Sequence, residues 1–338
     1  MQERKPDFER LRRVLLRDGE PDHVPFYELY ADQPIMEAIL GGPADREGYI
    51  RYQLQMGYDY VCAGAQFDYQ YRREYSQDTR REFVDNNHGM IENRRDFDAY
   101  PWPTVGPGVE AGLVRMQGDL PAGMKILISP PGGILENVMW LMGYVPLSYA
   151  LYEDEQLVWD LFERIGTNHI RAIELMFERG DREAIGGVVM GDDMGHFQGP
   201  MLAPEMMRKY VFPWQKKLVA KVHEYGKPFI LHSCGNLEAV MDDLIDDVGI
   251  DARHSYEDKI MPVWQFKERY GKRVAVMGGF DIDRLCRLTP EEVYRETAEL
   301  IRRCAPGGGW ALGTGNSVAS YVPVENFRAM MRAGMELG

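Results

Sequence analysis

Eight short apolar segments recur along the chain, and each is bounded by turn residues. Most are separated by stretches in which apolar residues follow the period of a helix. This alternation is typical of repeated strand–helix units that build a parallel sheet. The predicted strands are residues 24–29, 58–63, 124–129, 186–190, 228–232, 250–254, 273–277 and 309–312.

Two of the predicted helices have clear ends. Residues 153–179 are followed by Gly180, and residues 204–225 begin at Pro204 and are followed by Gly226. Proline is favoured near the start of a helix and glycine just past its end. Both segments are therefore predicted to pack as long helices against the sheet.

The eight strands favour one architecture over its competitor. A length of 338 residues fits one large barrel or two domains. A doubly wound open sheet usually has a glycine-rich first turn, and no Gly-x-Gly-x-x-Gly follows the first predicted strand. The sequence predicts an α/β fold, a single (β/α)₈ TIM-type barrel over 1–338, with a helical N-terminal extension at about 1–22 and an inserted loop at about 66–100 after the second strand.

The acidic composition excludes one class of partner. Lys and Arg number 39 against 53 Asp and Glu, which gives a formal charge of −14 with His neutral. Such a chain repels a phosphate backbone, so nucleic acid is not an expected partner.

No membrane segment is expected either. The longest apolar run, at about 138–151, is short and is interrupted by Gly143 and Pro146. The chain does not open on a charged and then apolar leader. Its four cysteines lack the spacing of a disulfide framework, as expected in a reducing compartment. The sequence predicts a soluble, cytoplasmic protein.

Polar side chains gather just past the predicted strands. In a barrel of this type the active site is built at the C-terminal ends of the strands. From this position we expect Glu28, Asp192 and Asp193 to be catalytic, and four further residues to contact substrate. These four are Tyr27, Gln66, Tyr256 and Asn316.

The fifth predicted strand ends in His-x-Cys. Phe229, Ile230 and Leu231 form a continuous apolar run, typical of a strand buried on both faces. Residues two apart on a strand point the same way, so His232 and Cys234 can share one target. Imidazole and thiolate are good zinc ligands, and a catalytic zinc needs three protein ligands. A buried histidine and a small buried cysteine are the structural alternative.

Several of these residues have a second reading. Asp192 and Asp193 are either an acid–base pair, or one of them caps a helix. His254 and Glu257 either orient His232 or supply the missing ligand. The glycine-rich residues 313–316 fit a phosphate cradle or a tight passage of the backbone. The aromatic and basic segment 67–75 fits a lid or an oligomer contact.

Three motifs resemble the uroporphyrinogen decarboxylase superfamily. They are Gly-Asp-Asp at 191–193, His-Ser-Cys-Gly at 232–235, and Pro-Val-Glu-Asn at 323–326 leading into Phe-Arg-Ala-Met. The resemblance implies a (β/α)₈ barrel and one of two activities. These are cofactor-free porphyrinogen decarboxylation, or zinc-dependent methyl transfer with corrinoid proteins or thiols. His-x-Cys on the fifth strand belongs to the methyltransferase branch.

The sequence departs from both branches. The decarboxylases carry an Arg-Gln-Ala-Gly-Arg stretch after the first strand, whereas residues 27–33 contain no arginine. Their aspartate after the second strand is also missing, since Gly-Ala-Gln stands at 64–66. The methyltransferases have a third zinc ligand, a cysteine, where this chain has Asn316. Asp193, His254 or Glu257 could complete the site, another metal could bind, or the site could have lost its metal.

The resemblance and the residues together predict a methyltransferase. We expect His232, Cys234 and Glu257 to hold zinc, and a methyl group to move between a small methylated compound or thiol and a corrinoid protein. The corrinoid is expected on a partner, since the chain shows no cobalamin-binding module; a homodimer is also compatible with the sequence. The alternatives are a decarboxylase or lyase acting on a small acid, and a non-catalytic ligand-binding barrel.

Overall fold

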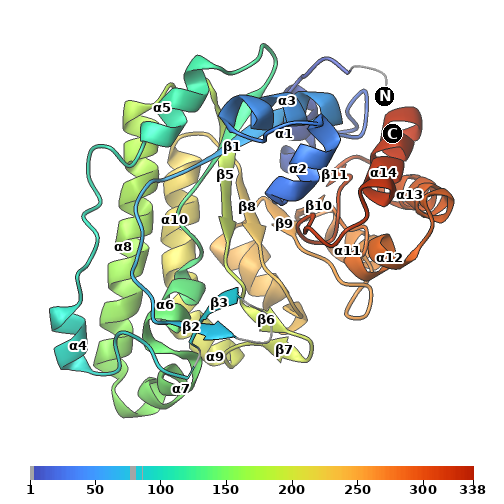
Figure 1. The fold of residues 1–338 in the computed structure, drawn as a ribbon. Coiled ribbons are helices and arrows are strands. Elements are labelled where there is room, and N and C mark those ends of the chain that lie inside the picture. Colours follow the sequence, from blue (N-terminus) through green and yellow to red (C-terminus); the bar gives the residue numbers. More distant parts are fainter. Residues whose placement is uncertain (1–3, 77–80, 86) are drawn as a thin grey trace.

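The computed structural model describes residues 4–76, 81–85 and 87–338 (Figure 1). Its centre is a parallel sheet of seven strands in the order β1-β4-β5-β8-β9-β10-β11. The strands are β1 Tyr60–Gly64, β4 Lys125–Ser129, β5 Ile185–Gly191, β8 Phe229–His232, β9 Ala252–His254, β10 Ala275–Met277 and β11 Trp310–Ala311. Each overlaps one predicted strand, so the prediction of a parallel α/β sheet is confirmed.

The first predicted strand, 24–29, is reduced to one parallel bridge between Phe26 and Leu312. On the other side, the Tyr60 hydroxyl bonds to the backbone N–H and carbonyl of Glu28. The Tyr60 hydroxyl therefore takes the hydrogen bonds that Glu28 would otherwise make in a backbone ladder with β1. Pro25 also lacks an N–H that a ladder would need. The prediction of a closed eight-stranded barrel is thus confirmed only in part within the described residues.

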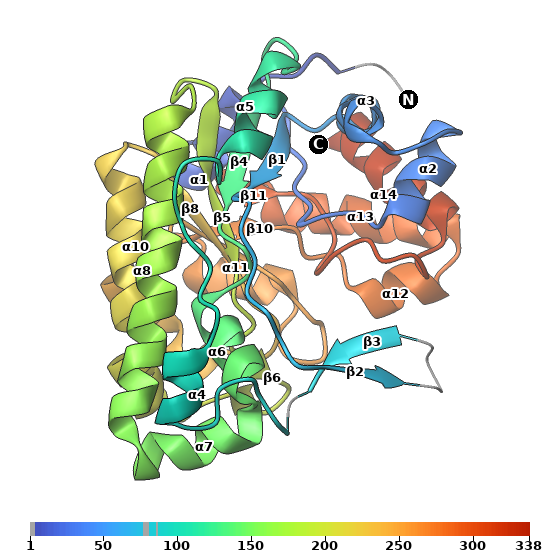
Figure 2. The ribbon, with the colours of Figure 1, turned by 60° about the vertical axis from the view of Figure 1, so that its left-hand side comes forward.

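Helices surround the sheet (Figures 1 and 2). Those before β5 are α1 Glu9–Leu16, α2 Gln33–Leu40, α3 Arg46–Met56, α4 Arg94–Ala99, α5 Ala111–Gly118, α6 Ile134–Met142, α7 Tyr144–Glu153 and α8 Glu155–Arg179. Those after it are α9 Pro204–Met206, α10 Phe212–Glu224, α11 Val263–Tyr270, α12 Ile282–Arg287, α13 Pro290–Cys304 and α14 Val324–Leu337. Short η segments lie at Met207–Val211, Glu238–Val240 and Asp243–Val248. None of the helices in the described part of the chain is both long and apolar enough to span a membrane.

The two long predicted helices are found with changed limits. The predicted segment 153–179 is α8, whose start is fixed by the Asp154 side chain accepting from the Leu157 N–H at 3.1 Å. The predicted segment 204–225 is interrupted by the π turn Met207–Val211 before α10. Pro213 cannot donate a helical hydrogen bond, which fits a break at this point.

The N-terminal extension and the insertion contain regular elements. Helix α1 lies within the predicted extension, of which residues 1–3 are outside the described part. The insertion holds the antiparallel strands β2 Arg73–Ser76 and β3 Arg81–Val84, then α4. Its residues 77–80 and 86 are outside the described part. Figure 2 shows the β2–β3 hairpin projecting from the end of the molecule where β6 Gly195–His196 also lies.

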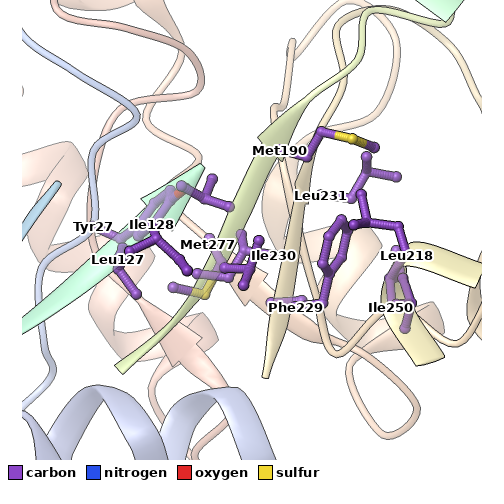
Figure 3. Close-up of a cluster of buried hydrophobic side chains, with 14 of the residues drawn as sticks. Tyr27, Leu127, Ile128, Met190, Leu218, Phe229, Ile230, Leu231, Ile250 and Met277 are labelled. Atoms are coloured by element: carbon purple, nitrogen blue, oxygen red, sulfur yellow. The ribbon is translucent and has the colours of Figure 1, made fainter. Parts of the chain in front are cut away.

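Alternation along β8 decides which side chains enter the curve of the sheet. Phe229 and Leu231 lie beside Leu218 of α10, whereas Ile230 lies beside Met277 on the other side of the strand (Figure 3). All five are buried. His232, two residues past Ile230, therefore points to the inner side. The apolar core thus sets the direction of the predicted metal ligand.

Candidate metal centre

The C-terminal ends of β5, β8 and β9 lie side by side. His232 pairs with Gly191 on one neighbouring strand and with His254 on the other. Asp193 lies two residues past β5, and Cys234 lies two residues past β8. Because parallel strands end at a common edge, the loops that carry these two residues meet.

Three side chains bring donor atoms together at this edge. One atom each from Asp193, His232 and Cys234 lies within 4.8 Å of the others. His232 Nε2 is 3.5 Å from Asp193 Oδ1 and 3.5 Å from Cys234 Sγ. In the described part of the chain, no other set of three His, Cys, Asp or Glu side chains converges in this way. His232 is buried, and the other two are half-buried.

Two glycines allow the loops to touch. Gly235 has φ of +78°, and a Cβ built on it would lie 2.3 Å from the backbone carbon of Gly195. A Cβ on Gly195 would lie 2.9 Å from the Cys234 carbonyl oxygen. Only glycine fits both positions without displacement. The contact also lets the Cys234 N–H donate to Asp193 Oδ1 at 2.8 Å, which holds the carboxylate beside the thiol.

A chain of hydrogen bonds fixes the protons of the two histidines. His254 Nε2 lies 3.1 Å from the Thr314 carbonyl, which can only accept, so this nitrogen carries a proton. Burial, followed by the charge of His232, lowers the pKa of His254 well below its usual range, so the ring is neutral. His254 Nδ1 must then accept from His232 Nδ1 at 2.7 Å. Nδ1 of His232 is thereby occupied by His254, and Nε2 is the nitrogen that is directed at Asp193 and Cys234.

The electrostatics of the group favour a cation. Burial, and then the Asp193 carboxylate, raises the pKa of the Cys234 thiol to about 12. Burial would also raise the pKa of Asp193, but the hydrogen bond and charge of His232 and the Cys234 N–H outweigh it and lower that pKa. A carboxylate thus stands beside a thiol that stays protonated unless a positive charge is added.

Asn316 is a further residue in contact with the group of donor atoms. Its Nδ2 donates to Cys234 Sγ at 3.3 Å, so the amide contacts the sulfur as a hydrogen-bond donor. Asn316 also lines a cavity of about 300 Å³ together with Tyr256 and Glu257. Three residues predicted from strand ends therefore line one cavity, and one of them, Asn316, also contacts the thiol.

Comparison with known proteins places the chain in a family. A sequence model described as uroporphyrinogen decarboxylase (URO-D) matches residues 126–337. The chain belongs to the uroporphyrinogen decarboxylase family. The matched region contains Asp193, His232 and Cys234, and the resemblance inferred from the sequence is confirmed.

Relatives of this family member fall into both branches. A methylated-thiol–coenzyme M methyltransferase of Methanosarcina mazei is 31% identical over 137 residues, or 40% of this chain and 34% of the relative. A methylcobamide:CoM methyltransferase MtaA of Methanosarcina barkeri is 26% identical over 263 residues, or 73% of each chain. A uroporphyrinogen decarboxylase of Anaeromyxobacter dehalogenans is 27% identical over 195 residues, or 56% of this chain and 51% of the relative. All three are named as enzymes.

A solved structure supports the fold. A methyltransferase from Methanosarcina mazei matches this uroporphyrinogen decarboxylase family member with a TM-score of 0.72, over 98% of this chain and 99% of the other. The identity is 16%, so this likeness shows the fold alone.

Asp192 lies outside the group of donor atoms. Its side chain is fully buried and accepts from the backbone N–H groups of Leu135 and Glu136, at the start of α6. Gln215 Nε2 adds a third hydrogen bond at 2.8 Å. Of the two readings of the Asp192–Asp193 pair, this geometry is that of a helix cap for Asp192. The capped helix is α6, which follows β4. Asp192 and Asp193 are adjacent in the sequence but therefore have different roles.

Glu136 is a carboxyl group that we did not single out from the sequence. It is half-buried, and its Oε2 accepts from the Gly133 N–H at 3.2 Å. Burial, then the charges of Asp192 and Asp193, raises the pKa of Glu136 to about 9. It therefore carries a proton at neutral pH. Its position after a predicted strand did not distinguish it, since the carboxylates that raise its pKa are distant in the sequence.

The other residues predicted to contact substrate differ in burial and in their contacts. Tyr27 is buried, with its ring edge-on to His254 at 5.3 Å between centroids. The Tyr256 hydroxyl donates to the Arg253 carbonyl at 3.0 Å, and Tyr256 also lines the cavity. Gln66 is exposed and lies 3.5 Å from the Arg115 guanidinium, outside the group.

Glu28 and the glycine-rich loop 313–316 are closely packed against each other. Glu28 is buried and bonds to Thr314. A Cβ on Gly313 would lie 1.7 Å from the Tyr27 carbonyl, and the Gly315 N–H donates to the Phe280 carbonyl at 2.6 Å. These contacts are those of a tight backbone passage, the second reading of residues 313–316.

The third donor in the structure is Asp193, whereas the sequence predicted Glu257. Glu257 is exposed and lies outside the group that converges on His232. Nitrogen, sulfur and oxygen donor atoms within 4.8 Å of one another fit a zinc ion. The residues present are therefore suited to the metal that the family resemblance implies.

Proposed function

We propose that the protein is a zinc-dependent methyltransferase that moves a methyl group between a small methylated compound or thiol and a corrinoid protein. The convergence of Asp193, His232 and Cys234 at the sheet edge carries this proposal. Two relatives are named as methyltransferases, and one of these names includes methylcobamide. The match to that relative covers 73% of each chain.

His232 and Cys234 would hold the metal, with Asp193 as the third ligand in place of Glu257. Zinc bound there would supply a Lewis acid that lowers the pKa of a bound thiol or polarises a methyl-bearing oxygen. A fourth position would remain for substrate, as in other catalytic zinc sites.

The protein's own groups would orient the reactants. The Asn316 amide donates to Cys234 Sγ and thereby withdraws charge from that sulfur. The cavity of about 300 Å³ that Asn316 and Tyr256 line would hold the small methylated compound or thiol. This volume is at the lower end of small-molecule sites, so a compact substrate is favoured.

Glu136 is a candidate proton donor for an O-methyl substrate. Glu136 is protonated at neutral pH, because burial and two nearby carboxylates raise its pKa to about 9. It could deliver a proton to an oxygen that leaves without its methyl group. Replacing it with Gln should then lower turnover of methoxy compounds and spare that of thiols.

Metal analysis tests the assignment of the ligands. Protein expressed in zinc-replete medium should contain about one equivalent of zinc, and Asp193→Asn and Cys234→Ser should lose most of it. Cys286→Ser is the matched control, since Cys286 lies in α12, outside the group. Wild-type protein with less than about a tenth of an equivalent would contradict the proposal.

Decarboxylation of a small acid is the second candidate, because one relative is a uroporphyrinogen decarboxylase at 27% identity. It needs no metal, so Cys234→Ser would leave activity intact, whereas methyl transfer would be lost. The capping bonds of Asp192 weaken this candidate, since that carboxylate is occupied by the N-terminus of α6.

A further inference from the structure

Glu28 is a buried carboxyl group that has no cationic partner among the described residues. Glu28 lies two residues after Phe26, which forms the bridge to Leu312, and Glu28 is 5% exposed. Glu28 Oε1 accepts from the Thr314 N–H at 2.8 Å, and Oε2 contacts the Thr314 hydroxyl. Within the described residues, no Lys, Arg or His lies within salt-bridge distance of it. A buried carboxylate with only these partners would be costly.

The Thr314 hydroxyl faces two acceptors with a single proton. Its Oγ1 contacts Glu28 Oε2 and lies 2.5 Å from the Asn316 carbonyl oxygen. A carbonyl can only accept, so the threonine proton belongs to the Asn316 bond. The contact with Glu28 is then a hydrogen bond only if the carboxyl group carries the proton and donates it. Burial raises the pKa of Glu28 to about 8, which agrees with this assignment.

Thr314 connects this carboxyl group to both sides of the metal centre. Its carbonyl accepts from His254 Nε2 at 3.1 Å, and His254 in turn fixes the proton of His232. Two residues on, Asn316 donates to Cys234 Sγ at 3.3 Å. The position of one short loop therefore governs the orientation of the imidazole and the environment of the sulfur.

We propose that Glu28 acts as an uncharged carboxylic acid that positions the Thr314–Asn316 loop against the zinc-binding side chains. Glu28 is in this view a positioning residue, in place of the catalytic role expected from its place after the first strand. Its consequence for zinc rests on the proposed function, whereas its protonation state does not.

Zinc affinity of three variants tests the positioning role. Glu28→Gln keeps the pattern, because its NH₂ can donate to Thr314 Oγ1 and its carbonyl can accept the Thr314 N–H. Glu28→Leu removes both bonds, and Thr314→Val removes the acceptor for the acid proton. In competition with a chromogenic chelator, Leu and Val should weaken zinc binding about 10–100-fold, and Gln should restore it. Circular dichroism confirms that each variant is folded.

Infrared spectroscopy tests the proton directly and needs no metal. The difference between zinc-free wild type and Glu28→Gln at pH 7 should contain the carbonyl stretch of a carboxylic acid. Since Glu136 is also protonated, the comparison is repeated in a Glu136→Gln background. If Glu28→Gln does not fold, the acid band is sought in ¹³C-glutamate-labelled Glu136→Gln protein.

A carboxylate band in place of the acid band would overturn the proposal, whatever the protein's activity. Intact zinc affinity in folded Glu28→Leu would equally do so. Loss of methyl transfer in Glu28→Gln with normal zinc affinity would instead return Glu28 to a catalytic role. A normal acid band in a protein that binds no zinc would reject the proposed function and leave the assignment of the proton standing.

Discussion

His232 and His254 face each other through their Nδ1 atoms at a distance of 2.7 Å. Because His254 Nε2 donates to the Thr314 carbonyl, His254 serves as the acceptor in this pair. The pairing of β8 with β9 sets this contact, since the two residues are direct partners in the parallel register. Sheet register thus determines which nitrogen of His232 is free for a metal.

Removal of this acceptor should weaken metal binding. In His254→Phe, the ring of His232 loses the partner that fixes its tautomer, and zinc affinity should fall about 10–100-fold. His88→Phe, at an exposed position, is the control. Chelator competition measures both. An unchanged affinity in folded His254→Phe would show that His254 is only a core residue.

Restoration of a cysteine at position 316 should strengthen metal binding. Asn316 Nδ2 lies 3.3 Å from Cys234 Sγ, so a thiolate at this position would reach the same ion. We expect Asn316→Cys to raise zinc affinity on the order of tenfold or more, because thiolate is a far better zinc ligand than an amide. Asn316→Ser, which shortens the side chain without adding a thiol, should not raise it. Equal affinities in the two variants would place the ion away from residue 316.

The strands and the His-x-Cys motif could be predicted from the sequence because they depend on local patterns. A continuous apolar run such as Phe229–Leu231 predicts a buried strand, and alternation then fixes the side to which His232 points. The prediction of the first strand was wrong because of a tertiary contact. The Tyr60 hydroxyl occupies the backbone groups of Glu28, and nothing near residue 28 indicates this.

The roles of neighbouring acids could not be separated by pattern. Asp192 and Asp193 are adjacent, yet one caps α6 and the other joins His232 and Cys234. The direction of each depends on how the chain turns after β5. Glu257 was predicted as the third ligand because it follows a strand, but the distance from a strand end does not determine convergence.

Stability should depend on pH through Glu28. Its pKa is about 8 in the folded protein against an ordinary value of 4.5, so the folded state holds a proton that the unfolded state releases between these values. The free energy of unfolding should therefore fall as pH rises through this window, by at most about 1.4 kcal/mol per pH unit from this group. Urea unfolding at pH 5 to 8 should show a smaller slope for Glu28→Gln than for wild type. Equal slopes would mean that Glu28 is ionised when folded.

Gly235 should be far less tolerant of a side chain than Gly226. Both have positive φ, +78° and +67°, so alanine costs about 1 kcal/mol of backbone strain at either position. No described residue lies within 4 Å of a Cβ at Gly226, whereas a Cβ at Gly235 would lie 2.3 Å from the backbone of Gly195. Gly235→Ala must therefore push apart the loops that carry Asp193 and Cys234.

The two effects can be measured separately. Gly226→Ala should lower the free energy of unfolding by about 1 kcal/mol and leave zinc affinity unchanged. Gly235→Ala should lose more stability and weaken zinc binding as well, because the Cys234 N–H bond to Asp193 at 2.8 Å depends on this contact. Denaturant unfolding and chelator competition on the same samples decide the matter. If both variants bind zinc like wild type, the close approach of the two loops is not what brings the carboxylate to the thiol.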